Sequence, residues 1–187
     1  TDELYFGLLQ LALSDFLRDA VGRLADTLQI RPDGELEPER LRLELWVRNI
    51  DDGHLEQWAL SDRLLRSAAD LVRERIRHES GIVSVDAFCF GHNVALDRRT
   101  PTQGRGGKTY LWQSMIAEPI RLSSDPYGIL QVGVLTLAST APRDESRLSA
   151  RPEQVVDLLR GIGEEVLSGT TLRDLAIREA DALSGLA

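Results

Sequence analysis

Residues 112–141 read W-Q-S-M-I-A-E-P-I-R-L-S-S-D-P-Y-G-I-L-Q-V-G-V-L-T-L-A-S-T-A, and this stretch decides the fold. It predicts two adjacent strands, because residues 123–128 supply turn chemistry, with proline presetting φ and glycine permitting a positive φ. The first strand ends at residues 118–122. The second, residues 129–138, is apolar at both alternating sets of positions, which is typical of a strand covered on both faces. We therefore expect the two strands to lie side by side in the middle of a sheet.

The composition is that of an ordinary folded domain. The chain has 187 residues, 42% hydrophobic and 28% charged, enough to bury a sizeable core. No apolar run approaches the roughly 18 residues of a membrane helix, and no signal peptide is visible. The chain lacks an initiator Met, so we expect a piece of a longer protein. The single cysteine, Cys89, excludes an internal disulfide and a multi-cysteine metal site and favours the cytoplasm. The net charge of −8 argues against nucleic-acid or anionic-membrane partners.

Periodicity predicts a long N-terminal helix and then a β-hairpin. In residues 4–28, apolar side chains repeat at spacings of three and four. Leu8 and Leu11 widen that stripe beyond one packing face, which suggests contact with a second chain or another helix. A helix docked only on its own sheet is the alternative. Residues 41–60 then form two runs joined by an Asp-Gly turn. In the first run, apolar residues recur at every second position, so the segment predicts a hairpin.

The remaining segments predict a mixture of short and long elements. Residues 61–78 predict a second helix capped by its first residues. Residues 81–91 fit a short helix and a strand equally well, and residues 93–97 predict a short strand. Pro152 suits the first turn of a helix, and a last helix is expected from Thr170.

Several of these segments resemble GAF domains. Residues 114–120 look like the family's S-x-x-x-x-P-[IL] strand, and residues 127–137 look like its strand with G-V-L-x-L. Residues 93–97 are similar to its edge strand, which often ends in Asp. Gly81 and the residues after it resemble the turn and short helix beside the family's ligand pocket. The resemblance spans residues 5–168.

The resemblance implies an α+β fold: a central antiparallel sheet of about six strands, helices on one face, a ligand cleft on the other and long N- and C-terminal helices. The chain would be one domain over residues 1–187, with a helix in 1–30, sheet and pocket in 31–141 and C-terminal helices in 150–187. It further implies a non-catalytic sensory domain of a bacterial signalling, transcriptional or defence protein. Ligand state would pass through terminal helices that form a homodimer. The alternative is a GAF-like dimerisation or protein-interaction module without a ligand.

Departures from the family pattern argue against three kinds of GAF domain, and they identify no cofactor. The N-K-x-F-D-E motif of cyclic-nucleotide-binding members is absent. A free methionine sulfoxide reductase of this family would need several cysteines, and the chain has one. A bilin-binding member usually has a Cys-His pair, whereas Cys89 is followed by Phe90. We therefore expect no enzyme and a small anionic or aromatic ligand.

A basic, glycine-rich loop at residues 98–108 is a candidate lid over an anionic ligand, because arginine binds both oxygens of a phosphate or carboxylate. A solvated loop is the alternative. The loop is not a P-loop, because G-x-x-x-x-G-K-[ST] needs glycine where Thr102 stands.

An aromatic cluster flanked by polar groups is what a small-ligand cleft uses, although packing under a loop would need the same residues. Glu118 is expected to face the cleft and to pair with Arg121 or a loop arginine, since a buried carboxylate needs a partner. No metal ligands are expected. The candidate ligand-binding residues are Phe88, Phe90, His92, Asp97, Arg99, Arg105, Lys108, Trp112, Ser114 and Glu118.

Overall fold

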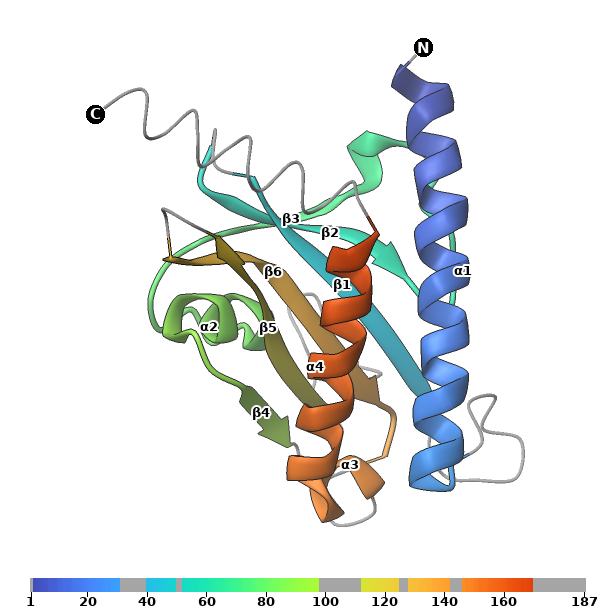
Figure 1. Ribbon diagram of the computed structural model, residues 1–187, viewed down its shortest axis with the longest axis vertical. Helices are drawn as coiled ribbons and strands as arrows, with labels where there is room; N and C mark the ends of the chain where they lie inside the picture. Colours follow the sequence, from blue (N-terminus) through green and yellow to red (C-terminus); the bar gives the residue numbers. More distant parts are fainter. Residues whose placement is uncertain are drawn as a thin grey trace, which may run out of the picture.

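Six antiparallel strands form one sheet in the order β3-β2-β1-β6-β5-β4 (Figure 1). The computed structural model describes residues 2–30, 40–49, 52–97, 112–124, 128–141 and 146–169. The strands are β1 (Leu41–Asn49), β2 (His54–Leu60), β3 (Val72–Arg75), β4 (Val94–Asp97), β5 (Ser114–Ser124) and β6 (Gly128–Ser139). The helices are α1 (Asp2–Leu28), the 3₁₀ turn η1 (Ala68–Asp70), α2 (Val83–Phe90), α3 (Arg147–Ala150) and α4 (Pro152–Ser168). Within the described ranges, no helix is long and apolar enough to cross a membrane.

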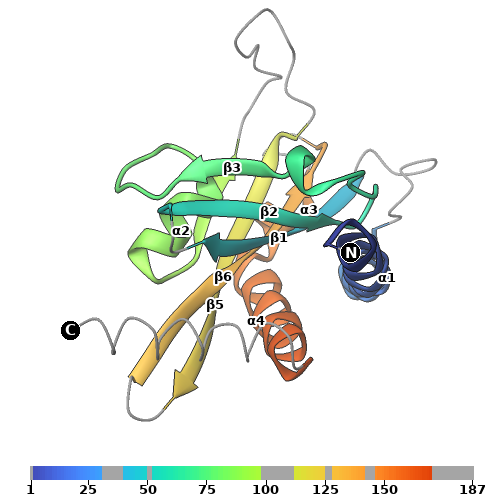
Figure 2. The ribbon, with the colours of Figure 1, turned by 90° about the horizontal axis from the view of Figure 1, so that it is seen from above.

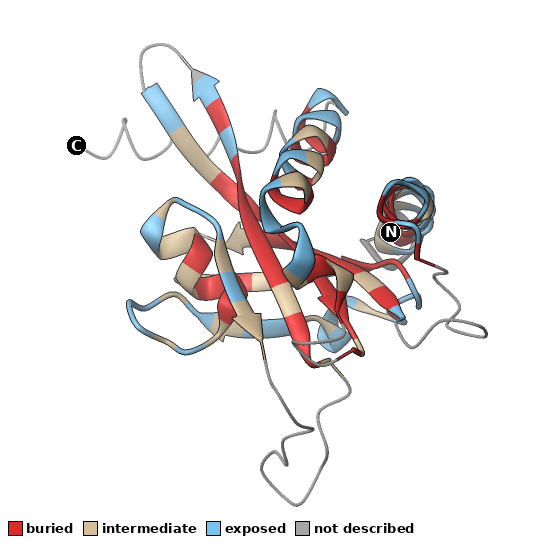
Figure 3. Cartoon of the chain, turned by 90° about the horizontal axis from the view of Figure 1, so that it is seen from below, coloured by how far each residue is buried: buried red, intermediate tan, exposed pale blue. Residues whose placement is uncertain are grey.

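The two central strands expected from the sequence are confirmed. β5 and β6 pair from Ser114 with Ser139 to Ser124 with Gly128, and β6 also pairs with β1. β6 therefore has a strand on each side, and its residues from Val132 onward are buried (Figure 3). The far end of the hairpin differs from the expectation, because Ile129 is 67% exposed. That end extends beyond the residues that pair with β1 (Figure 2), and Gly128 and Ile129 at its tip are exposed.

The sheet carries helices on both faces. α1, α3 and α4 pack on one face through the larger apolar cluster, which includes Leu43, Leu135 and Leu159. α2 packs on the opposite face through a smaller cluster that includes Trp46 and Val134 (Figure 2). The face on which the GAF resemblance places a cleft is therefore partly covered by α2.

α1 is the N-terminal helix expected from the periodicity. Its buried stripe, which includes Leu17, Leu24 and Leu28, faces the sheet. Two polar residues continue this stripe: the Gln10 side chain donates to the carbonyl oxygen of Trp58, and Ser14 Oγ donates to that of Leu60 at 3.1 Å. These two contacts join α1 to the backbone of β2.

The expected helix over residues 61–78 is wrong. This segment contains η1 and the edge strand β3, in which Val72 pairs with Gln57 of β2. Arg73 Nε lies 3.0 Å from Glu56 Oε2, and its guanidinium also contacts Asp52. Strand pairing and these ion pairs outweigh the weak helical pattern, whose Val72 is 39% exposed.

Short segments follow the remaining expectations. Residues 83–90, which fit helix and strand equally, form α2, and residues 94–97 form the expected strand β4. α4 begins at Pro152 and buries Val155, Leu159, Ile162 and Val166 as expected. The basic loop at residues 98–108, part of the turn at residues 123–128, and the helix expected from Thr170 lie outside the described residues.

Candidate functional site

The face of the sheet under α2 has an apolar floor and a polar rim. The floor is made of buried residues from the sheet and from α2, namely Trp46, Leu55, Val83, Val85, Ala87, Ala117 and Val134. Because this cluster is continuous, α2 sits directly on the strands. The polar groups on this face are therefore held in fixed positions.

Both ends of α2 are fixed by its flanking residues. Asp86 Oδ1 accepts hydrogen bonds from Ser80 N at 2.9 Å and Ser80 Oγ at 2.7 Å, and Asp86 Oδ2 accepts one from Gly81 N at 3.2 Å. Gly81 has φ of 77° and Gly91, at the end of the helix, has φ of 71°. Both values lie in the left-handed region that glycine adopts without strain.

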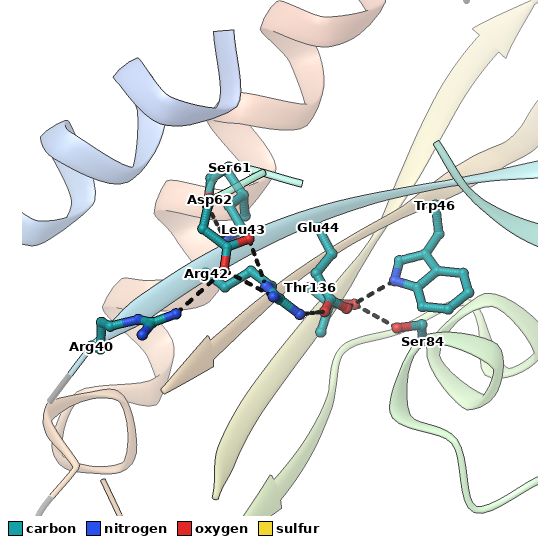
Figure 4. Close-up of polar contacts among 9 residues, drawn as sticks. All are labelled: Arg40, Arg42, Leu43, Glu44, Trp46, Ser61, Asp62, Ser84 and Thr136. Carbon is teal, nitrogen blue, oxygen red and sulfur yellow. Dashed lines mark hydrogen bonds and ion pairs between the residues drawn. The ribbon is translucent and has the colours of Figure 1, made fainter. Parts of the chain in front are cut away.

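A set of polar contacts joins α2 to the central strands. Ser84 Oγ of α2 and Thr136 Oγ1 of β6 lie 2.7 Å apart, and both side chains are buried. On the neighbouring strand, Trp46 Nε1 donates to Glu44 Oε1 at 3.1 Å. Figure 4 shows these two contacts side by side. Register places Glu44 directly opposite Thr136.

Arg42 connects this buried group to the end of the sheet. Its guanidinium donates two hydrogen bonds to Asp62, at 2.9 and 2.8 Å, and its Nη1 lies 3.8 Å from Glu44 Oε2 (Figure 4). It also lies 4.6 Å from the centre of the Trp112 ring. Arg40 lies 5.6 Å from the same ring centre and 3.5 Å from Asp62 Oδ2. We call Arg40, Arg42, Glu44, Asp62 and Trp112 the arginine–tryptophan cluster.

Burial raises the pKa of Glu44 above its ordinary value of 4.5, and the hydrogen bond from Trp46 and the charge of Arg42 oppose this rise. The residue Glu44 is only 5% exposed. Loss of water disfavours its charged form more than these partners favour it. A buried carboxyl with a perturbed pKa beside a specific charge partner is a candidate functional group.

We expect Glu44→Gln to stabilise the protein at neutral pH more than at acid pH. The pKa of Glu44 is higher in the folded state than in the unfolded state. Protonated Glu44 therefore stabilises the folded wild-type protein fully below the unfolded-state pKa, and this stabilisation is lost as pH rises through the folded-state pKa. The glutamine does not titrate. The difference in free energy of unfolding should grow by about 1.4 kcal/mol for each unit by which the pKa is raised. Urea unfolding of both proteins from about pH 4 to 8 measures it; a difference independent of pH would contradict it.

The structure brings together only some of the residues expected to bind a ligand. Phe90 is 44% exposed, and its ring stacks on that of His92 with 5.6 Å between centres. Phe88 is partly buried against the apolar floor under α2. Trp112 belongs to the arginine–tryptophan cluster. Arg99, Arg105 and Lys108 lie outside the described residues.

Three other expected residues lie elsewhere. Asp97 Oδ1, at the end of β4, accepts a hydrogen bond from Ser149 Oγ at 2.5 Å. Ser114 is buried, and its Oγ donates to the carbonyl oxygen of Ala141 at 2.9 Å. Glu118 shares a face with the buried residues Ile116 and Ile120, which pack under the terminal helices.

The expectation that Glu118 faces the cleft is therefore wrong, because side chains alternate along a strand. Its ionic partner is Arg160 of α4, whose Nε lies 3.4 Å from Glu118 Oε1. Arg121, the expected partner, points to the other face, where its guanidinium donates to the carbonyl oxygen of Gly91.

Arg42, Glu44 and Asp62 were absent from the sequence-based candidates. Arg42 and Glu44 occupy the polar positions of an alternating strand, a pattern that ordinarily indicates a solvated face. Two features of the sequence pointed to them: Trp46 stands among the polar positions of β1, and Thr136 stands inside the apolar β6. Both indicate a face that is partly polar and covered.

No family model matches the chain, and no curated protein matches its sequence. Solved structures do resemble it. A free methionine-R-sulfoxide reductase from Neisseria meningitidis is 16% identical, with 82% of this chain and 83% of that chain covered and a TM-score of 0.42. A GAF domain from an Acinetobacter phosphoenolpyruvate-protein phosphotransferase is 14% identical, with 83% and 84% covered and a TM-score of 0.46. A far-red cyanobacteriochrome photoreceptor is 10% identical, with 86% and 92% covered and a TM-score of 0.46.

The structure has the α+β arrangement that the sequence resemblance implies, one six-stranded antiparallel sheet with helices packed against it. The expectation that the chain is not an enzyme is corrected by the comparison with solved structures, because the similar structures include free methionine-R-sulfoxide reductases.

Proposed function

We propose that the chain is a ligand-sensing regulatory domain of a bacterial signalling, transcriptional or defence protein. The ligand is a small anionic or aromatic molecule that binds beside the arginine–tryptophan cluster. The observation that carries this proposal is the chain of contacts from buried Glu44 through Arg42 to the Trp112 ring. The lone cysteine supports a reducing compartment such as the cytoplasm.

The cluster has the chemistry for such a ligand. Arg40 has a side chain that is 44% exposed, and its guanidinium has five N–H donors, with one on Asp62 at 3.5 Å. The Arg40 guanidinium can therefore donate two parallel hydrogen bonds to a carboxylate or phosphate. Trp112 adds a flat apolar surface beside it, and the Arg42–Asp62 pair keeps the two arginines in place. The Arg42 and Asp62 side chains are 16% and 22% exposed, and a partly exposed ion pair is weak evidence for stability alone.

A mechanical connection to the terminal helices supports the regulatory part of the proposal. β1 carries Arg42 and Glu44 on one face and Leu43 and Leu45, which are fully buried, on the other. Those leucines belong to the cluster under α1 and α4. The two helices are joined by Arg23, whose guanidinium donates to both oxygens of Glu165 at 2.9 and 3.0 Å. A ligand with different affinities for two positions of β1 would shift the helices accordingly.

We expect a ligand from a panel of nucleotides, organic acids, aromatic amino acids and haem to raise the melting temperature. At 100 times its Kd, a ligand should stabilise the folded state by about 2.7 kcal/mol. Arg40→Gln and Trp112→Leu should each abolish the shift for that ligand. Arg18→Gln is the matched control, because Arg18 lies exposed on α1 with Asp15 as its partner.

A dimerisation module without a ligand is the second candidate. Leu8 and Leu11 of α1 are 59% and 49% exposed, so their apolar side chains are available to a second chain. A groove of about 500 Å³ also runs between α1 and α4. No thermal shift across the panel, together with a dimer in sedimentation velocity, would favour this candidate over ligand sensing.

A further inference from the structure

The edge strand β3 and the turn before it carry a positive charge on an acidic chain. Residues 63–77 contain five arginines and two carboxylates, a net charge of +3, whereas the whole chain carries −8. Arg73 is held by two carboxylates of the neighbouring hairpin. The other four arginines are exposed, and among the described residues no side chain pairs with them. We call these four the basic edge: Arg63, Arg66, Arg75 and Arg77.

β3 has a partner strand on one side only. It pairs with β2, and Figure 2 shows it as the outermost strand beyond β2. Within the described ranges, no strand pairs with its outer side. An edge strand of this kind presents backbone N–H and C=O groups with which a further strand can pair. Val72, the first residue of β3, is 39% exposed and adds an apolar contact point.

A hollow of about 450 Å³ lies in the turn that leads into β3. It is lined by Arg63, Leu64, Leu65, Arg66 and Asp70. Asp70 is the one carboxylate of this lining, and its Oδ2 already accepts a hydrogen bond from Ser67 N at 3.2 Å. Leu64 is 47% exposed. The hollow therefore offers two guanidinium groups and an apolar side chain beside the unpaired edge.

We propose that β3 and the basic edge bind an extended acidic segment of a partner protein, which pairs with β3 as a further strand. Backbone hydrogen bonds to β3 hold the segment, and its carboxylates meet the guanidinium groups, each of which can donate two parallel hydrogen bonds to one carboxylate. Charged side chains on an edge strand normally exclude other strands. An acidic strand is the kind that arginines attract.

Charge also decides between this partner and a second copy of the chain. Pairing of β3 with β3 of another copy would bring like charges together, which destabilises a strand pair. The net charge of −8 repels an acidic segment at long range. At physiological salt, however, charges are screened beyond roughly 8 Å, so the local surface of residues 63–77 determines binding.

The test is fluorescence anisotropy of the full chain with a labelled, amidated peptide, Glu-Val-Glu-Val-Glu-Val-Glu, at roughly 0.15 M salt. We expect saturable binding, with slower amide hydrogen exchange at residues 72–75 in the complex. The same peptide with lysine in place of glutamate should not bind. The peptide with proline in place of valine keeps its charge and loses backbone donors, so it should bind about tenfold more weakly.

Single glutamine substitutions at Arg63, Arg66 and Arg75 should each weaken binding about two- to fivefold, the effect of one exposed ion pair. The triple variant should weaken it about tenfold or more, as the combined loss of such pairs. Arg151→Gln is the matched control, because Arg151 is exposed too and also has no side-chain partner among the described residues. It should bind the acidic peptide as the wild type does.

The site goes beyond the proposed function, because it uses the outer side of β3 and not the arginine–tryptophan cluster. Arg40→Gln and Trp112→Leu should therefore bind the peptide normally, which separates the two proposals. Absence of saturable binding by the acidic peptide would overturn the proposal. Equal affinity for the proline peptide would overturn strand pairing, and undiminished binding by the triple variant would exclude the basic edge as the site.

Discussion

Gly133→Ala is expected to destabilise the fold by about 3 kcal/mol or more, at the upper end of overpacking effects. Gly133 lies in β6, where it is paired with Val47 of β1 and Ile120 of β5. A Cβ at this position would overlap the carbonyl oxygen of Trp46 and would lie 3.3 Å from the Cα of Val47. These are backbone atoms of β1, so they cannot move aside as a flexible side chain can.

The measurement is the free energy of unfolding in urea. Gly161→Ala in α4 serves as the control, because its Cβ meets nothing within 4 Å. Alanine is the better helix former, so this control should be stabilised by roughly 0.5–1 kcal/mol. A Gly133→Ala protein within about 0.5 kcal/mol of the wild type, the usual range for a surface change, would show that β1 and β6 separate more easily than their pairing implies.

Leu135→Ala is expected to cost about 2–5 kcal/mol, as large-to-small substitutions in cores do. Leu135 is 0% exposed and lies in the centre of the sheet, opposite Leu45 of β1 and Glu118 of β5. Its Cδ1 would lie 3.8 Å from a Cβ on Gly163, so it packs directly beneath α4. Truncation leaves a cavity at the contact between sheet and helix.

Ile129→Ala on the same strand is the matched control. Ile129 is 67% exposed, so its truncation should change stability by no more than about 0.5 kcal/mol. Chemical denaturation of both variants measures the two values. If both variants lost the same free energy, the core would not be centred on the sheet–helix contact.

Local patterns predict most of the long elements. The stripes of α1 and α4, the alternation in β1 and the β5–β6 hairpin are each contained within one stretch of chain. Hydrophobic periodicity reports which side of such an element is buried, whatever lies opposite. The central position of β6 also follows from its sequence, because apolar residues at both alternating sets of positions require cover on both faces.

The edge strand β3 formed because of residues that are distant in the sequence. Val72–Arg75 has no strand pattern of its own, and it becomes β3 because β2 offers an unpaired edge and because Glu56 and Asp52 attract Arg73. The strand preference of such a segment depends on its neighbours more than on its residues. A helix over residues 61–78 was therefore the wrong prediction.

The candidate site shows the same division. Chemistry-bearing residues such as Trp112 and Glu118 could be found in the sequence, as could the alternation that separates Arg42 and Glu44 from the leucines between them. Alternation assigns side chains to two faces, but it carries no information about what covers each face. Glu44 is buried on one face of the sheet, and packing of α4 on the other face encloses Glu118. Periodicity is a property of the local chain, whereas burial of a charge depends on which distant element packs over it.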